Sequence, residues 1–430
     1  MSTLMEHPDA QALLEQTEVE PATVNSCSRH LTAFIQRYLP FFYRDEHRGH
    51  ADTILRGKLT GLQRKTTEPI ARQAHQKRRP LQHFLGAGQW SDDAVLDELR
   101  RHLAAELADP KAILVLDPSA IAKKGSSSCG VQRQWNGNLG KVDNCQVGVF
   151  LAYAAPRGKA LVADRLFLPQ ERAEDRMHRL LTGIPDNITY REKWRIGLDL
   201  VRGPGRSLPH AWVVGDDEFG RASELRGLLR YDGERYALDV PCNTSIRDLS
   251  QRRPPSRPGG PERPPLWENV EAWAARQPKK RWCYFTVRNG EKGPLRIKAL
   301  QQWVQTKDED GCAGTRERLV VIRSVEKKPR TWYVLTNASK ETPLVAVVQA
   351  HAARHRVEEL FEEGKGEVGL GHYEVRSWIG WHHHMTLTLL ALWFLQLQRL
   401  RLGGKKSGPD SVVNPADFHG VAASAPAVCA

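Results

Sequence analysis

Apolar positions in the first quarter of the chain recur with the 3.6-residue period of an α-helix. One apolar stripe consists of Leu31, Phe34, Ile35 and Tyr38, which share a helical face. A second helical segment is expected from 52 to 79, where Pro69 would kink or divide it. A third begins after Ser91, whose hydroxyl can cap the helix that follows. A short helix at 10–16 is expected in the leader.

From Lys111 the pattern changes to short, continuous apolar runs. Residues 112–116 predict a buried central strand that delivers Asp117 at its tip. A second acidic strand end follows at 211–215, which runs into Asp216 and Asp217 before a helix reaching Leu229. Further strands are expected at 146–154, 161–168 (joined by a hairpin turn at 156–159) and 236–240, with helices at 175–181 and 190–201.

Strands alternating with helices, with acids at two strand ends, predict an α/β sheet with its site along the carboxyl edge. Asp216 and Asp217 are alternative acids at the second strand end. We favour Asp216 because Asp-x-x-Phe-Gly puts it at the last strand position, with Gly220 opening the helix.

The second half of the chain begins with residues rich in Pro, Gly and Arg at 248–265, which we interpret as a flexible linker; a basic arm on DNA is the alternative. Strands at 282–288, 319–324 and 332–336 then predict a β-rich insertion, and 378–400 an apolar helix. The expected division is a flexible leader 1–28, a helical DNA-binding domain 29–108, a catalytic core 109–245, linker and insertion 246–345, the C-terminal helices of the core 346–402, and a disordered tail 403–430.

The charge balance favours a polyanionic partner. The 430 residues include 63 Lys and Arg against 50 Asp and Glu, a net charge of +13, so nucleic acid is the first candidate. Residues 44–79 carry ten Lys or Arg and four acids, either a DNA footprint or a solvated helical face. We expect a cytoplasmic protein for three reasons. The seven cysteines are scattered, there is no signal sequence, and the longest apolar run (385–397) is too short to span a bilayer.

The stretch 351–365 carries the most specific pattern. On one continuous helix, Arg354, Glu358 and Lys365 would project within roughly 40° of one another, and His351 roughly 60° from Arg354. An exposed, solvated face is the simpler interpretation of such a pattern. The acids Asp117 and Asp216 favour a site instead. Three carboxylates can hold two Mg²⁺ ions for in-line displacement at a phosphodiester, and nearby cations can hold the phosphates.

At this point the sequence resembles a known family, the DDE (RNase H-like) insertion-sequence transposases, and among them insertion-sequence family 701. The likeness covers roughly residues 30–400. The Y-R-E-K signature of that group has the spacing of His351, Arg354, Glu358 and Lys365 in this chain. Similar blocks are Lys124-Gly125, Gly130-Val131-x-x-Gln134, Gly140-Lys141-x-x-Asn144-Cys145-Gln146, Leu166-x-Leu168-Pro169 and Gly369-Leu370-x-x-Tyr373-x-x-Arg376.

The resemblance implies an RNase H-like mixed sheet flanked by helices and a β-rich insertion before the glutamate. It implies Asp117, Asp216 and Glu358 as ligands of two Mg²⁺ ions, with Mn²⁺ as a substitute. Arg354 and Lys365 would contact DNA phosphates, as would His351, which stands where the family has Tyr. The expected activity is cutting and joining of double-stranded transposon-end and target DNA by a homodimer on paired ends, in a bacterial cytoplasm and on the nucleoid when bound. A catalytically inactive DNA-binding protein and a nuclease without strand transfer are the alternatives.

Other candidate residues add less. Several cations lie around Trp135 in the segment after Asp117, and they predict a DNA contact near the cleaved phosphodiester. They are Lys123, Lys124, Arg133 and Lys141. The adjacent histidines 382–384 would point in different directions on a helix, which disfavours a shared metal. The tryptophans of the insertion are expected mostly in its core, though one could stack on an extruded base.

Overall fold

The computed structural model describes residues 21–137, 139–251, 266–290, 293–326 and 328–403. The helix expected at 10–16, most of the predicted linker and the predicted tail lie outside the described residues. No helix within these ranges is both long and apolar enough to cross a bilayer.

The N-terminal part is helical, as the 3.6-residue pattern predicts. Ser91 caps the last of these helices through a hydrogen bond from Ala94 N to its hydroxyl (3.1 Å). Pro69 does not divide a helix: the chain leaves the helix after Lys58 and begins the next at Thr67, so the proline lies in a first turn, where its ring is tolerated. The helices are α2 (Pro21–Tyr38), α3 (Asp45–Lys58), α4 (Thr67–Gln73), α5 (Arg78–Gly86) and α6 (Asp92–Leu107), with a 3₁₀ turn at Leu39–Phe41.

The centre of the molecule is a mixed sheet in the order β4-β3-β1-β5-β6. Its strands are β1 (Ile113–Ala122), β3 (Lys141–Ala155), β4 (Gly158–Leu166), β5 (Trp212–Gly215) and β6 (Tyr236–Asp239), with the short β2 (Gln132–Asn136) beside β3. The first three form an antiparallel meander closed by the predicted turn at Pro156, while β1, β5 and β6 run parallel. This confirms the RNase H-like mixed sheet.

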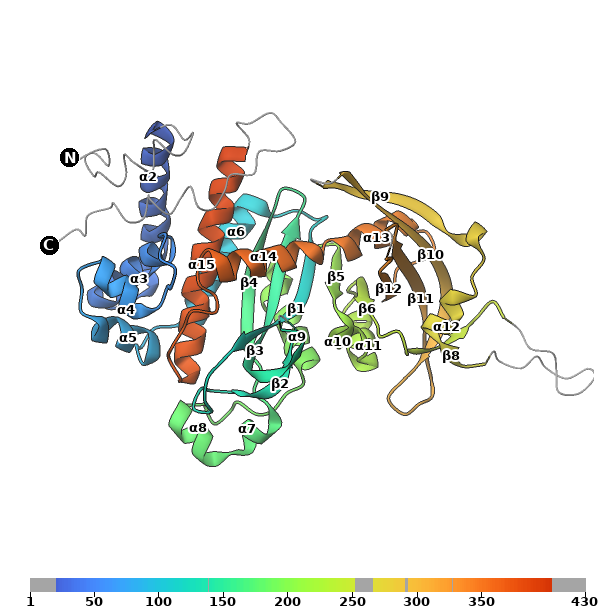
Figure 1. Ribbon diagram of the computed structural model, residues 1–430, viewed down its shortest axis with the longest axis horizontal. Coiled ribbons are helices and arrows are strands. Elements are labelled where there is room, and N and C mark those ends of the chain that lie inside the picture. Colours follow the sequence, from blue (N-terminus) through green and yellow to red (C-terminus); the bar gives the residue numbers. More distant parts are fainter. Residues whose placement is uncertain (1–20, 138, 252–265, 291–292, 327, 404–430) are drawn as a thin grey trace, which may run out of the picture.

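The strands expected after residue 265 do not form a separate sheet. β12 (Thr331–Thr336) pairs with β6, and the sheet continues through β11 (Ala313–Ser324) and β10 (Gly293–Lys307) to β7 (Ser245–Asp248) and β8 (Glu268–Asn269), with β9 (Cys283–Gly290) also on β10. The long strand β10 was not predicted. Figure 1 shows one sheet running through the molecule, with α2–α5 at one end and β9–β12 at the other.

Helices cover both faces of the central sheet. On one face, α14 (His355–Gly366) reaches β3 through the Phe361 ring, 5.1 Å from that of Phe150. On the other, α9 (Lys193–Arg202) packs so closely that a Cβ on Gly197 would lie 3.2 Å from Leu116 Cδ1. The remaining elements are α7 (Gln170–Glu174), α8 (Arg176–Thr182), α10 (Asp217–Gly220), α11 (Ser223–Tyr231), α12 (Val270–Ala275), α13 (Leu344–Ala352) and 3₁₀ turns at Pro204–Ser207 and Lys279–Arg281.

The predicted apolar helix is α15 (Trp378–Gly403), which joins the N-terminal helices to the sheet in one hydrophobic core. Its three adjacent histidines are buried and hydrogen-bond in different directions to backbone carbonyls. His382 bonds to Trp378, His383 to Leu85 and Trp90, and His384 to Leu370. The ring of His383 also stacks on Trp90 at 3.6 Å. His383 therefore fastens α15 to the N-terminal helices, and the three histidines do not converge on a metal.

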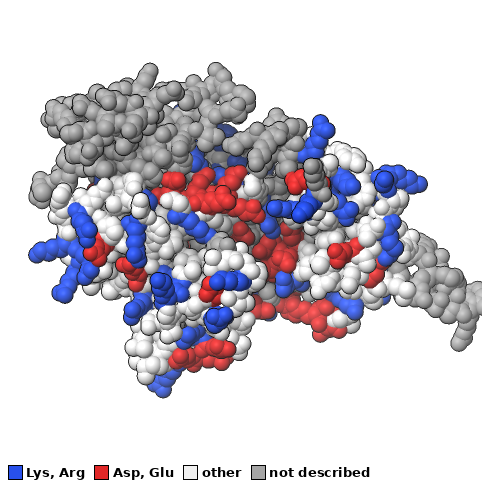
Figure 2. All heavy atoms as spheres, viewed as in Figure 1, with Lys and Arg blue, Asp and Glu red and all other residues white. Residues whose placement is uncertain are grey.

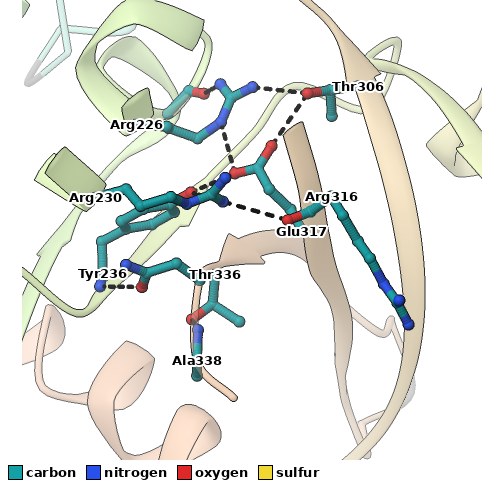
Figure 3. Close-up of polar contacts among 10 residues, drawn as sticks. Arg226, Arg230, Tyr236, Thr306, Arg316, Glu317, Thr336 and Ala338 are labelled. Carbon is teal, nitrogen blue, oxygen red and sulfur yellow. Dashed lines mark hydrogen bonds and ion pairs between the residues drawn. The ribbon is translucent and has the colours of Figure 1, made fainter. Parts of the chain in front are cut away.

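A buried polar network ties the central strands to β10 and β11 (Figure 3). Glu317, 1% exposed, accepts from Arg226 Nε (3.0 Å) and from the Tyr236 hydroxyl (2.6 Å) on one oxygen. Its other oxygen accepts from Thr306 (3.1 Å), which in turn accepts from Arg226. Arg226 also donates to the carbonyl of Gly220, at the end of α10. The network thus fixes α10, α11 and β6 against the outer strands.

Replacing Glu317 by Ala should lower the free energy of unfolding by about 3–5 kcal/mol, because it leaves Arg226 buried without its carboxylate. Chemical denaturation of the intact chain measures this loss. The matched control is Glu341→Ala, since its ion pair with Lys340 is solvent-exposed and should contribute almost nothing. Equal stability of the two variants would contradict the role of the network.

Candidate active site

Three aspartates lie at the same level of three neighbouring parallel strands. Leu116 of β1 pairs with Gly215 of β5, and Gly215 with Leu238 of β6. The residues that follow these partners are Asp117, Asp216 and Asp239. Adjacent strands are about 4.8 Å apart, so the three carboxylates form a row across the sheet.

The position of Asp117 differs from the prediction in one respect. It does not end its strand, since β1 continues to Ala122 through its pairing with β3. Only the parallel pairing with β5 stops at Leu116, which leaves Asp117 where the sheet opens on that side. It pairs with Phe150, whose ring contacts Phe361 of α14. Directly paired residues share a face of the sheet, so Asp117 faces α14.

Of the two acids after β5, Asp216 is the one that acts electrostatically on Asp117. Asp216 caps α10 by accepting from Glu218 N (3.1 Å), so the carboxylate lies at the junction of strand and helix. The Asp217 carboxylate is half-exposed and pairs with Arg221 at 3.1 Å. Gly220 ends α10 instead of opening it.

The segment 351–365 is not one continuous helix, contrary to the prediction. α13 ends at Ala352 and α14 begins at His355, and the turn between them uses i→i−3 bonds, such as Arg354 N to His351 O (3.1 Å). Residues three apart eclipse one another in such a turn. His351 and Arg354 consequently line up and reach the same carboxylate, Asp239.

Asp239 is a site residue that the sequence analysis missed. Its Oδ2 accepts from Arg354 (3.0 Å), and its Oδ1 lies 3.0 Å from Nε2 of His351. The other end of the Arg354 guanidinium donates to Glu358 Oε1 (3.2 Å), and His355 Nδ1 lies 3.1 Å from the second oxygen of Glu358. His351 and Arg354, both expected to bind DNA phosphates, therefore have a carboxylate partner within the protein.

The charges of the first two acids are poorly compensated. Burial, followed by the nearby Asp216 carboxylate, raises the pKa of Asp117 well above its usual range, although Arg354 and Lys365 oppose the shift. Burial raises the pKa of Asp216 to about 6, and Arg354 opposes this shift as well. Glu358 behaves differently: its hydrogen bond with His355 lowers its pKa. Carboxylates that are unfavourably charged attract a cation.

No three His, Cys, Asp or Glu side chains within the described ranges stand close enough to form a ready-made metal site. Asp117 and Asp216 have the donor chemistry that Mg²⁺ prefers and the uncompensated charge that a cation would relieve. Glu358 lies nearby on α14, with its oxygens engaged by Arg354 and His355. The donor chemistry and charge of Asp117 and Asp216 therefore suit a metal, and Glu358 would have to turn to join them.

The predicted DNA-binding lysines near the acids have different surroundings. Lys365 lies seven residues after Glu358 on the same helical face, close enough to Asp117 for that carboxylate to counter the lowering of its pKa by burial. Lys123 points inward: its Nζ donates to Tyr373 O (2.8 Å) and lies 3.3 Å from the centre of the Tyr373 ring. It therefore holds the loop after α14 against β1.

The remaining predicted DNA contacts are at the surface. Arg133 and Lys141 lie on the hairpin of β2 and β3, and Trp135 between them is 61% exposed. Lys124 is exposed beyond the end of β1. On the face drawn in Figure 2, acidic side chains gather over α14 and the ends of β5 and β6, with Lys and Arg on both sides. This charge pattern suits cations at the centre and a DNA backbone across the flanks.

Comparison with known proteins defines the class. Residues 37–294 match the family described as DDE superfamily endonuclease, and the chain belongs to it. The match includes Asp117 and Asp216 and ends before Glu358. The chain is also similar to the probable transposase for insertion sequence element IS701 of Microchaete diplosiphon, with 34% identity over 125 residues. The alignment covers 27% of this chain and only 31% of that relative.

The raised pKa of Asp216 makes stability depend on pH. An ordinary Asp titrates near 4, so between about pH 4 and pH 6 the folded state binds more protons than the unfolded state, and stability falls as pH rises. Asp216→Asn keeps the helix cap and removes this charge. Without divalent cations it should raise the free energy of unfolding at pH 8 by about 1–3 kcal/mol.

Denaturation in a chelating buffer at pH 4 and pH 8 measures this difference. Asp217→Asn is the matched control, since that carboxylate is half-exposed and already paired with Arg221. A wild-type protein as stable at pH 8 as Asp216→Asn would show that the Asp216 charge is compensated.

Proposed function

We propose that this protein is a DNA transposase that cuts element-end DNA and joins it to a target through a two-metal site. The observation that carries the proposal is the pair of poorly compensated carboxylates, Asp117 and Asp216, on adjacent parallel strands of a DDE-family fold. Such a pair has little use in a protein that only binds DNA, because buried charges without compensation are costly.

Asp117, Asp216 and Glu358 would hold two Mg²⁺ ions, with Mn²⁺ as a substitute. When bound, these ions would activate water or a 3′-hydroxyl and stabilise the leaving oxygen. Strand backbone fixes Asp117, and the capped turn into α10 fixes Asp216. Glu358 would complete the site by releasing His355 from its Oε2, while Arg354 stays on its Oε1.

Lys365 is the best placed cation for the scissile phosphate, because it lies on the Glu358 face of α14 and within the field of Asp117. Arg354 retains further donors beyond its two bonds to carboxylates and could contribute one to a phosphate. Lys124, Arg133, Lys141 and the Trp135 ring would contact DNA outside the cut. The protein would act as a homodimer on paired element ends. It would lie in the cytoplasm, and on the nucleoid when it is bound to DNA.

The helices α3–α5 offer a second DNA contact. Of the ten cations in residues 44–79, Lys58 and Lys65 are buried and cannot bind DNA from the surface. Exposed cations of this stretch are Arg44, Arg64, Arg72, Lys77, Arg78 and Arg79. The N-terminal helices share their core with α15, where the Phe34 and Phe394 rings lie 5.3 Å apart. For that reason DNA binding is best tested on the intact chain.

Changing Asp117→Asn, Asp216→Asn or Glu358→Gln should abolish Mg²⁺-dependent cleavage while sparing DNA binding, because the metals act on the transition state. The substrate is a supercoiled plasmid that carries the gene with its flanking genomic DNA. Asp217→Asn should cleave like the wild type. Cleaved ends that join to target DNA would identify a transposase, and cleavage without joining a nuclease. If Asp216→Asn cleaved like the wild type, the proposed active site would be wrong.

Replacing Lys77, Arg78 and Arg79 together by Ala should weaken DNA binding and flatten its salt dependence. Each lost phosphate contact should reduce the slope of log K against log salt by about 0.9. Arg195→Ala is the control, because Arg195 lies on α9, across the sheet from α14. Gel-shift titrations from low to moderate salt give both slopes. An unchanged slope in the triple variant would move DNA binding away from α5.

A further inference from the structure

The third aspartate of the row has a different environment from the other two. Asp239 is 6% exposed. Its Oδ2 accepts a hydrogen bond from Arg354, and its Oδ1 lies 3.0 Å from Nε2 of His351 without forming a hydrogen bond. A third uncompensated carboxylate, one strand spacing from Asp216, would add to the repulsion in the row and offer metals a competing ligand. The ion pair of Asp239 with Arg354 reduces both effects.

The same contacts fix the side chains at the start of α14 relative to the sheet. Arg354 bridges Asp239 and Glu358 with its two terminal nitrogens, at 3.0 Å and 3.2 Å. A planar guanidinium holds two carboxylates in a fixed relation, which a lysine cannot do. The sheet therefore sets where Arg354 lies, and Arg354 sets where the Glu358 side chain lies.

We propose that Asp239 is a positioning residue of the active site, which anchors the α13–α14 turn through His351 and Arg354 and thereby aligns Glu358 with Asp117 and Asp216. This inference rests on the proposed metal-dependent function of those three acids. Asp239 itself would touch neither metal nor DNA.

The backbone around Asp239 is held from two directions. A Cβ on Gly220 would lie 1.8 Å from the Asp239 carbonyl oxygen, so α10 can press against β6 only because residue 220 is glycine. At the other end of β6, the Tyr236 hydroxyl belongs to the buried network of Glu317 (Figure 3). The anchor thus sits on a strand whose position is fixed by α10 and the outer strands.

Nε2 of His351 and Oδ1 of Asp239 lie 3.0 Å apart, yet neither atom has a hydrogen-bond partner among the described residues. A small rotation of the ring would let His351 act in this anchor as a hydrogen-bond donor. A tyrosine hydroxyl, which the resembling signature has at this position, could donate to the same carboxylate, whereas phenylalanine could not. His351→Tyr and His351→Phe therefore form a matched pair that differs by one oxygen atom. The anchor predicts that the first retains cleavage and the second loses it.

Asp239→Asn tests the proposal directly, because it keeps the volume and removes the charge that holds Arg354. Metal affinity and cleavage should each fall about 10–100-fold, the usual effect of losing a residue that orients a ligand. Mn²⁺ binding to the DNA-free intact protein, measured by electron paramagnetic resonance, gives the affinity without reference to activity. Half-saturating Mg²⁺ in plasmid cleavage should rise correspondingly, while DNA affinity stays unchanged.

Arg354→Gln breaks the same link from the other side and covers the case in which Asp239→Asn does not fold. If Asp239 acts through Arg354, the double variant should bind Mn²⁺ no more weakly than Arg354→Gln alone. Asp232→Asn is the control, since Asp232 pairs with Arg202 at 2.6 Å elsewhere in the fold, and it should match the wild type.

The outcomes separate the two proposals. A wild-type protein without metal-dependent cleavage would overturn the proposed function. A cleaving wild type, together with wild-type Mn²⁺ affinity in folded Asp239→Asn or in Arg354→Gln, would overturn the positioning role alone. Equal activity of His351→Tyr and His351→Phe would also contradict the anchor.

Discussion

Repulsion between like charges is the constraint on which this structure depends. The register of β1, β5 and β6 places three aspartates side by side at about one strand spacing. The protein meets this in two ways. It neutralises the β6 acid with Arg354, and it leaves the β1 and β5 acids with raised pKa values that a cation would relieve.

The rest of the fold keeps this row in place. The outer strands extend the central sheet and hold β6 and α10 through the buried Glu317 network. On the opposite side, α15 joins the N-terminal helices to the sheet through one core. The exposed cations of α3–α5 and of the β2–β3 hairpin are therefore attached to the same sheet that carries the acids, so DNA held by them could be presented to the acids.

Local sequence patterns predicted much of this arrangement. They failed where contacts between residues far apart in the sequence determine the structure. Asp117 and Asp216 follow apolar strands and were predicted from sequence. Asp239 ends the equally apolar β6, and only the parallel order β1-β5-β6 shows that it joins the row. The turn between α13 and α14 was missed because it depends on Asp239, more than 100 residues earlier. β10 was missed because its apolar residues face two clusters on opposite sides, Ile297 and Ala299 toward one, Leu300 and Val304 toward the other.

The position of a bound metal would show whether Asp117 and Asp216 bind it while Asp239 stays paired with Arg354. Crystals of the wild-type protein soaked with Mn²⁺ would reveal the ion by its anomalous scattering. We expect a peak at the carboxylates of Asp117 and Asp216, with Asp239 still bound to Arg354. A peak at Asp239 with Arg354 displaced, or none at the Asp117–Asp216 pair under saturating Mn²⁺, would contradict it.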